Sequence, residues 1–250
     1  MSLTFSVAPN LSDDVDTSQH IKLRTSLTFV AANVTHSARQ QIETFISNGF
    51  ATRYNARITS FMPMLFALEV NGIKAAVGAR CGATGSMNHV LFIEQYLVMT
   101  IESALQHHGI SAKRHEIVEV GNLFSSSSRY TLPLLLSLCF LFSQLGKKHL
   151  VFSATKQLKQ LLQGAGISLT ALADADAKKL VSNHDDWGAY YDTAPQVMAL
   201  SLRNVTHHVM RSAPLRKYYL QAIGLVAASD SEQQLSDTLV CEHKGASHVA

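Results

Sequence analysis

IVEVGNLFSSSSRYTL, residues 117–132, joins an apolar, β-prone run to four consecutive serines, an arginine and the start of a long apolar segment. Residues Glu116–Phe124 predict a strand, and Thr131–Leu145 predict a helix that is apolar on nearly all sides. Thr131 matches a helix cap, and Gly146 matches a helix stop. A strand, a polar loop and a helix in this order predict the central unit of an α/β protein.

The rest of the chain alternates between strand-like and helix-like segments. Strands are predicted at 23–30, 64–70, 73–79, 149–153, 167–172 and 195–205, and helices at 37–50, 91–108, 155–164 and 215–227. Asn71-Gly72 tolerates the positive φ angles of a two-residue turn, so it predicts an antiparallel hairpin. Ser37 and Gln40 match a capping box, Gly49 a stop, and Thr155 a cap. This order indicates an α/β or α+β sheet.

Length and composition predict one main domain. The chain has 250 residues, of which 47% are hydrophobic, and this is enough to bury a substantial core. We expect the domain at residues 23–227, between a flexible N-terminal leader at 1–22 and a polar tail at 228–250, because neither end carries enough apolar periodicity to offset the entropy of ordering it.

Several classes of protein are disfavoured by the sequence. A charge of +3 with scattered Lys and Arg argues against nucleic-acid binding. The longest apolar run, Leu132–Phe142, is far shorter than the roughly 20 residues of a membrane-spanning helix. The N-terminus lacks the pattern of a secretory signal, and Cys81, Cys139 and Cys241 suggest no disulfide framework, so we expect a cytoplasmic protein. The twelve histidines fall into no known ligand spacing, which predicts no metal site.

The serine row is the first candidate for chemistry. Backbone N–H groups at a helix start converge on anions, Ser125, Ser126, Ser127 and Ser128 add hydroxyl donors, and Arg129 adds a cation. These residues therefore match a phosphate-binding turn, although spacing alone favours an ordinary flexible loop, in which serine runs are common. No Walker or dinucleotide glycine motif is present.

Glu119 is the second candidate. A carboxylate between Val118 and Val120 is costly to bury unless it is paired or its pKa is raised, and a raised pKa suits a general base. Two other interpretations stay open. This face of the strand could be exposed to solvent, or Glu119 could pair with an arginine such as Arg53, Arg57 or Arg80.

The segment WGAYYDTAP, Trp187–Pro195, gathers the only tryptophan and two tyrosines beside the acid pair Asp185-Asp186. Aromatic clusters usually belong to a core or an interface. A tyrosine in this segment could instead donate a proton or line a pocket.

Six stretches together resemble the thermostable hemolysin family. They are RYNARITSFMPML (53–65), LFIEQYL (91–97), EIVEVGNL (116–123), VFSATKQLKQLL (151–162), LADAD (172–176) and WGAYYDTAPQVMA (187–199). That family is in turn similar to the GNAT acyltransferases, especially acyl-homoserine-lactone synthases and N-acyl amino acid synthases. The resemblance implies a mixed, mostly antiparallel sheet with splayed central strands and flanking helices.

The resemblance also implies roles for particular residues. The related enzymes carry E-x-x-R-[FL] on the strand before the cofactor loop, and Glu119 takes the position of the base, whereas Asn122 replaces the arginine. The loop after this strand would receive the phosphate of acyl-CoA or of the phosphopantetheine of an acyl carrier protein, and 149–155 would be the splayed partner strand. The usual loop motif [QR]-x-x-G-x-[GA] is absent, which favours a carrier protein or a degenerate CoA site.

The leading hypothesis is therefore an acyltransferase that moves a fatty or related acyl group to a small-molecule amine. Catalytic roles are predicted for Glu119 and Tyr190, cofactor binding for Leu123, Phe124, Ser125, Ser126, Ser127, Ser128, Arg129, Ser153 and Thr155, and substrate binding for Arg53, Phe61, Asn122 and Trp187. One alternative is a membrane-active hemolysin, supported by the family name and by the basic amphipathic segment Leu215–Ala227. Another is a catalytically inactive GNAT-like binding module.

Overall fold

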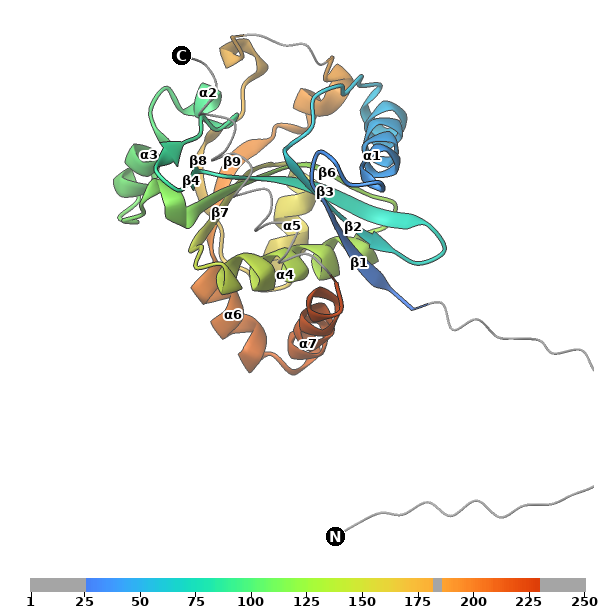
Figure 1. Cartoon of the computed structure of the whole chain (residues 1–250). Helices are drawn as coiled ribbons and strands as arrows, with labels where there is room; N and C mark the ends of the chain where they lie inside the picture. Colours follow the sequence, from blue (N-terminus) through green and yellow to red (C-terminus); the bar gives the residue numbers. More distant parts are fainter. Residues whose placement is uncertain (1–25, 182–185, 230–250) are drawn as a thin grey trace, which may run out of the picture.

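A seven-stranded mixed sheet organises residues 26–181 and 186–229, which are the residues that the computed structural model describes (Figure 1). In spatial order the strands are β1 (Thr28–Ala32), β2 (Met64–Glu69), β3 (Ile73–Cys81), β6 (Ile117–Ser125), β7 (His149–Ala154), β9 (Gln196–Ser201) and β8 (Thr170–Asp174). The pair β6–β7 is parallel, and the other neighbours are antiparallel. The mixed, mostly antiparallel sheet is thus confirmed. The predicted leader and nearly all of the predicted tail lie outside the described residues.

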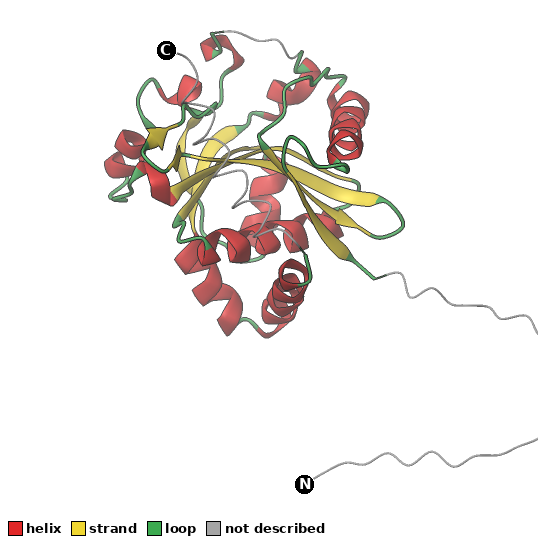
Figure 2. Ribbon diagram, viewed as in Figure 1, coloured by secondary structure: helices red, strands yellow, loops and turns green. Residues whose placement is uncertain are grey.

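Helices cover both faces of this sheet (Figure 2). One face carries α1 (Arg39–Tyr54), α2 (Glu94–Leu97) and α3 (Ile101–His107), and the other carries α4 (Ser128–Gln144), α5 (Lys156–Gly164), α6 (Leu202–Arg211) and α7 (Ala213–Ala227). Short 3-10 turns lie at Arg114–Glu116, Ala177–Lys179 and Gly188–Thr193, and a small hairpin is formed by β4 (Ala83–Thr84) and β5 (Met87–Asn88). None of the described helices is both long and apolar enough to cross a bilayer, and no metal-binding group of His, Cys, Asp or Glu occurs among the described residues.

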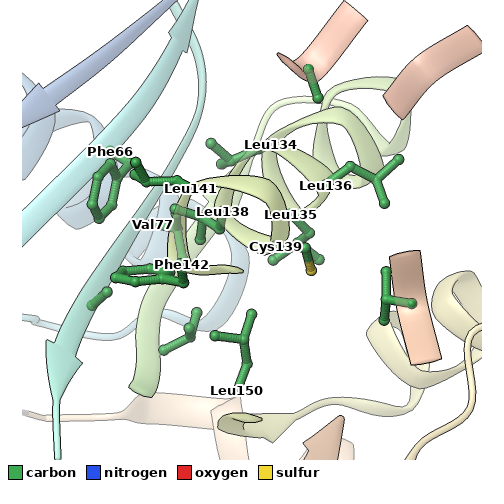
Figure 3. Close-up of a cluster of buried hydrophobic side chains, with 14 of the residues drawn as sticks. Phe66, Val77, Leu134, Leu135, Leu136, Leu138, Cys139, Leu141, Phe142 and Leu150 are labelled. Carbon is green, nitrogen blue, oxygen red and sulfur yellow. The ribbon is translucent and has the colours of Figure 1, made fainter. Parts of the chain in front are cut away.

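The helix α4 forms the centre of the main core. It lies between the sheet on one side and α6 and α7 on the other, so almost every side chain of the apolar run from Leu134 to Phe142 is buried (Figure 3). Phe142 packs edge-on against Phe66 of β2, with ring centroids 6.0 Å apart. This position between two layers explains why the helix is apolar on nearly all sides.

Two local predictions around the central unit are confirmed and one is wrong. Asn71 and Gly72 have φ angles of 50° and 90°, and they connect the antiparallel strands β2 and β3. Gly146 ends α4 with a φ angle of 71°. Thr131, however, is not the cap of α4. The helix begins one turn earlier, after Ser127, and Thr131 is buried within its first turn.

The predicted helix at 91–108 is in fact two helices. Val98 adopts a left-handed conformation with a φ angle of 60°, which separates α2 from α3. The Thr100 side chain then caps α3 by accepting from the Ser103 amide. The carboxylate of Glu94 accepts hydrogen bonds from the amides of Leu91 and Ile101, so tertiary and capping contacts outweigh the four-residue apolar repeat.

The predicted ends of α1 are also wrong. The N-cap is Ala38 and has no side-chain hydrogen bond, so the Ser37–Gln40 capping box does not form. Gly49 does not stop the helix, which continues to Tyr54 and ends at the left-handed Asn55. A Cβ atom at Gly49 would lie 2.2 Å from the Phe124 ring, so the glycine permits α1 to approach the sheet closely.

For the elements after α4, the predicted kind of secondary structure is more accurate than the predicted ends. Thr155 caps α5 as expected, accepting from the Leu158 amide. The segment 195–205 is strand only as far as Ser201, whose hydroxyl caps α6. The strand expected at 167–172 begins later, at Thr170, because the Ile167 amide donates to the Leu162 carbonyl at the end of α5.

Candidate functional site

A gap between β6 and β7 opens the centre of the sheet. Residues Ile117–Val120 of β6 pair with His149–Phe152 of β7. The pairing ends there, although β6 continues to Ser125. Opposite β3, the residues Asn122 and Leu123 of β6 face the single residue Val77, so β6 carries a bulge where it leaves β7. The splayed central strands are thus confirmed.

A pocket of about 460 Å³ passes through this gap. On the side of α1 and α2 its wall includes Glu119, which alternates along β6 with Val118 and Val120 of the main core. On the other side its wall includes Leu135 of α4 and Leu158 of α5. Lining residues thus come from both faces of the sheet. A pocket can connect the two faces only where neighbouring strands separate.

Glu119 is buried in the wall of this pocket, with 1% of its surface exposed. Its two carboxylate oxygens accept hydrogen bonds from the amides of Phe92 and Ile93, at 3.0 and 2.9 Å. Arg80 lies directly opposite on β3, with a guanidinium nitrogen 3.8 Å from the carboxylate. The interpretation that this face of the strand is exposed is wrong, and of the three arginines considered, Arg80 is the partner.

The pKa of Glu119 is raised to about 6. Burial is the largest cause, because it disfavours the charged form. The charge of Arg80 and the two amide hydrogen bonds oppose the shift, and the nearby Glu94 adds to it. The carboxylate is therefore ionised at neutral pH and accepts a proton readily, which is the property that a general base requires.

This raised pKa predicts how stability changes with pH. Between the ordinary value of 4.5 and about 6, the unfolded chain releases the Glu119 proton while the folded chain retains it, so the free energy of unfolding falls as pH rises. The loss should total roughly 2 kcal/mol at 1.36 kcal/mol per pKa unit. Urea unfolding at a series of pH values should show this decline in the wild type and its absence in Glu119→Gln.

Glu94 provides a control of opposite sign. Its pKa is lowered by hydrogen bonds to Arg114 and to backbone amides, which outweigh the opposing effect of burial. Its contribution to stability is therefore lost as pH falls below its ordinary value. A Glu94→Gln variant that lost the decline between pH 4.5 and 6 would contradict the assignment to Glu119.

Asn122 holds a neighbouring loop against the sheet. Its side-chain oxygen accepts from the Met62 amide at 3.0 Å, and its side-chain nitrogen donates to the Ser60 carbonyl at 3.2 Å. It has a φ angle of 50°, a conformation that asparagine tolerates better than most residues. Asn122 lines the pocket, and both ends of its amide are engaged with the 60–62 backbone.

Of the four consecutive serines, only two line the pocket. Ser125 and Ser128 line the pocket, and the Ser125 hydroxyl donates to the Ser127 carbonyl at 2.7 Å. Ser126 instead donates to the Lys74 carbonyl, and Ser127 is the N-cap residue of α4. Neither of these two is part of the pocket lining.

Two further predicted cofactor ligands lie away from the pocket. Arg129 is exposed and folds over the ring of Tyr130, whose hydroxyl accepts its hydrogen bond at 2.7 Å. Phe124 packs against Gly49 and Phe45 beneath α1. The cation that does reach the pocket at this end is Arg53, which lies over Phe124 and donates to the Ser125 carbonyl at 3.3 Å.

The structure brings most of the other predicted residues to the pocket. Its lining includes Leu123, Ser153, Thr155, Phe61, Trp187 and Tyr190. The Tyr190 hydroxyl lies 3.2 Å from the Ser153 hydroxyl, so it joins the Trp187 segment to β7 at the gap. Burial raises the pKa of the Tyr190 phenol, which therefore stays protonated at neutral pH.

A profile of the thermostable hemolysin family matches residues 32–206. The chain belongs to this family. The match runs from the end of β1 into α6 and includes every residue that lines the pocket. No curated protein matches the chain.

Solved structures similar to this family member include three synthases. The AHL synthase LasI is 11% identical, with a TM-score of 0.47 over 71% of this chain and 91% of that chain. The N-acyl amino acid synthase FeeM, from uncultured soil microbes, is 13% identical, with a TM-score of 0.47 over 70% and 92%. The CoA-dependent acyl-homoserine lactone synthase BjaI, solved with SAM and isopentyl-CoA, is 9% identical, with a TM-score of 0.48 over 78% and 100%.

In this member of the family, sequence reasoning missed much of the pocket wall. The residues without a predicted role include Phe50, Tyr54, Phe92, Tyr96, Leu135, Leu158 and Leu161. Arg80 had a usable signal, because extending the predicted hairpin places it at the end of β3, and it was among the three candidate partners of Glu119. The leucines of α4 and α5 had none, since apolar residues at helical spacing are equally typical of a core.

Proposed function

We propose that this protein transfers an acyl group from a pantetheine thioester to a small-molecule amine. The observation that carries the proposal is the pocket through the β6–β7 gap, with buried Glu119 on one face of the sheet and an apolar wall on the other. Such a passage allows an acceptor and an acyl donor to meet from opposite faces. The donor is acyl-CoA or an acyl carrier protein.

The donor would occupy the side of α4 and α5. Leu135, Leu158 and Leu161 provide apolar surface for an acyl chain. The donor phosphate would lie near Ser125 and Ser128, where the first amides of the long helix α4 favour an anion and Arg53 adds a positive charge.

Glu119 would act as the base. It accepts one proton from the acceptor ammonium, and the free amine then attacks the thioester carbon. The new C–N bond forms as the C–S bond breaks, and the second nitrogen proton passes to the departing thiolate. Amides at the edge of β7 beyond Phe152, where no β6 residue is paired, would stabilise the oxyanion. The protonated Tyr190 hydroxyl, held by Ser153, would donate a hydrogen bond to the leaving sulfur.

A direct experiment is to incubate purified protein with an acyl-CoA or acyl carrier protein series and a mixture of amines. Mass spectrometry should detect N-acylated products together with stoichiometric release of free thiol. Free thiol without N-acyl product would indicate hydrolysis and would contradict the proposal. Absence of both with every donor would contradict it equally.

A second candidate function, association with a membrane surface, is favoured by α6 and α7. No carboxylate occurs between Asp192 and Asp230. The outward residues of the two helices combine cations with exposed apolar side chains, namely Arg203, Met210, Arg211, Arg216, Lys217, Tyr218 and Leu220. Basic and apolar residues on one helical surface are typical of proteins that lie on anionic bilayers.

For this candidate we expect sedimentation with phosphatidylcholine vesicles only when they contain phosphatidylglycerol. Replacing both Arg216 and Lys217 by glutamine should weaken binding about 20-fold or more, at roughly 1 kcal/mol per basic residue. The matched control is Lys156→Gln with Lys178→Gln, which changes the charge equally elsewhere on the surface. Equal losses for both pairs would contradict a specific role for α6 and α7.

A further inference from the structure

We propose that the acceptor is an aryl-alkyl monoamine, meaning a primary amine on a short chain that ends in an aromatic ring and carries no carboxylate. This inference rests on the proposed acyl transfer and names the class of its acceptor. Its basis is the part of the pocket on the face of α1 and α2, which we call the acceptor chamber.

Aromatic side chains from three separated segments line the acceptor chamber. They are Phe50 and Tyr54 of α1, Phe92 before α2 and Tyr96 within it, and Trp187 and Tyr190 at the start of the 188–193 turn. Neighbouring rings meet in tilted or edge-on contacts, with centroids 5.4 Å apart for Tyr54–Tyr190, 5.5 Å for Trp187–Tyr190 and 6.1 Å for Phe92–Trp187. The rings thus form one continuous wall, which favours a flat apolar group of the acceptor.

Glu119 is the only carboxylate that lines the pocket within the described residues. The amide of Phe92 donates a hydrogen bond to the Glu119 carboxylate at 3.0 Å. An ammonium group directed at Glu119 would also pass the faces of aromatic rings, which attract cations. The chamber therefore has a place for one positive charge next to an aromatic surface.

The arginines of the pocket offer little to an acceptor carboxylate. Arg80 faces Glu119 at 3.8 Å and donates to the Val90 carbonyl at 3.4 Å. A second carboxylate at Arg80 would lie close to Glu119 and be repelled by it. Arg53 lies on the other side of the bulge, over Phe124 and beside Ser125, where the donor phosphate is expected. An amino acid would thus leave its carboxylate unpaired near an anion.

Trp187 makes acceptor binding measurable without turnover. It is the only tryptophan of the chain and lines the chamber, so its fluorescence reports a ligand there. We would titrate the full chain with phenethylamine, phenylalanine, butylamine and phenylpropionate. Phenethylamine should bind at least tenfold more tightly than each of the other three, since each of them lacks the ring, lacks the amine or adds a carboxylate. Equal or tighter binding of phenylalanine or butylamine would overturn the inference.

A variant tests the aromatic wall itself. Phe92→Leu keeps apolar volume and the backbone amide that contacts Glu119, and it should weaken phenethylamine at least fivefold while leaving butylamine unchanged. An equal effect on both ligands would overturn the role of the ring. Acylation of several amines with equal kcat/KM would contradict this inference and leave acyl transfer standing. Tight phenethylamine binding without any acyl product would instead support the chamber and contradict the proposed reaction.

Discussion

Replacing Glu119 by glutamine should lower kcat/KM for acyl transfer by about 100- to 10,000-fold, which is the usual contribution of general base catalysis. Glutamine matches the size of glutamate and cannot accept the acceptor proton. The measurement is the initial rate of free-thiol release that depends on amine, with N-acyl product confirmed by mass spectrometry. In the wild type, kcat/KM should rise with pH through about 6 as Glu119 ionises, and in the variant that rise should be absent.

The control must separate base catalysis from positioning. Glu119 also orders residues 92–93 through two amide hydrogen bonds, and the glutamine amide can accept only one of them. Glu94→Gln disturbs the same segment, because Glu94 accepts from the Leu91 and Ile101 amides, but it leaves Glu119 in place. Glu94→Gln should therefore retain the rise, moved to lower pH because the Glu94 charge no longer raises the pKa of Glu119. An unchanged pH profile in Glu119→Gln would show that the carboxylate is structural.

The second large effect concerns stability. Phe142→Ala should lower the free energy of unfolding by about 3–5 kcal/mol, because it removes a large side chain from a core that cannot close the space. Phe142 is 1% exposed and joins α4 to the sheet through Phe66 (Figure 3). Urea unfolding monitored by circular dichroism measures this loss.

Phe140 offers a matched control on the same helix. It is only partly buried and packs against Tyr219 of α7, so Phe140→Ala should cost clearly less than Phe142→Ala. Losses of the same size at both positions would contradict the central place of Phe142 in the core.

The parts of the fold that could be predicted depend on local chemistry. Asn71-Gly72 specifies a turn through its backbone freedom, and Thr155 specifies a helix start through its hydroxyl. The strand from 116 to 124 and the helix after it were predicted because apolar residues dominate both segments. In each case the residues that decide the structure lie within a few positions of one another.

The errors arise where distant residues override the local pattern. The periodicity of 91–108 indicates one helix, but the carboxylates of Glu94 and Glu119 bind amides of this segment, and Val98 turns the chain. Gly49 resembles a helix stop, yet the Phe124 ring from another element occupies the space beside it. Glu119 and Phe124 belong to β6, so neither partner lies within the sequence window of the helix that it affects.

The sequence pointed to several polar residues of the candidate site, but it did not predict the shape of the pocket. Glu119 and Tyr190 are unusual in their sequence surroundings, and both line the pocket. The predicted cation Arg129 turns away onto Tyr130, whereas Arg53 reaches the pocket from α1. The route through the sheet depends on where β6 leaves β7, and strand pairing across the chain sets that point.

We propose that an acyl thioester enters the β6–β7 gap with its acyl chain between α4 and α5. The most direct measurement is a crystal structure of the protein with a non-hydrolysable thioether analogue of acyl-CoA. We predict the sulfur in the gap near Ser153 and Tyr190, the alkyl chain against Leu135 and Leu158, and the phosphates near Ser125, Ser128 and Arg53. An analogue bound elsewhere, or a gap left empty at saturating analogue, would contradict this account.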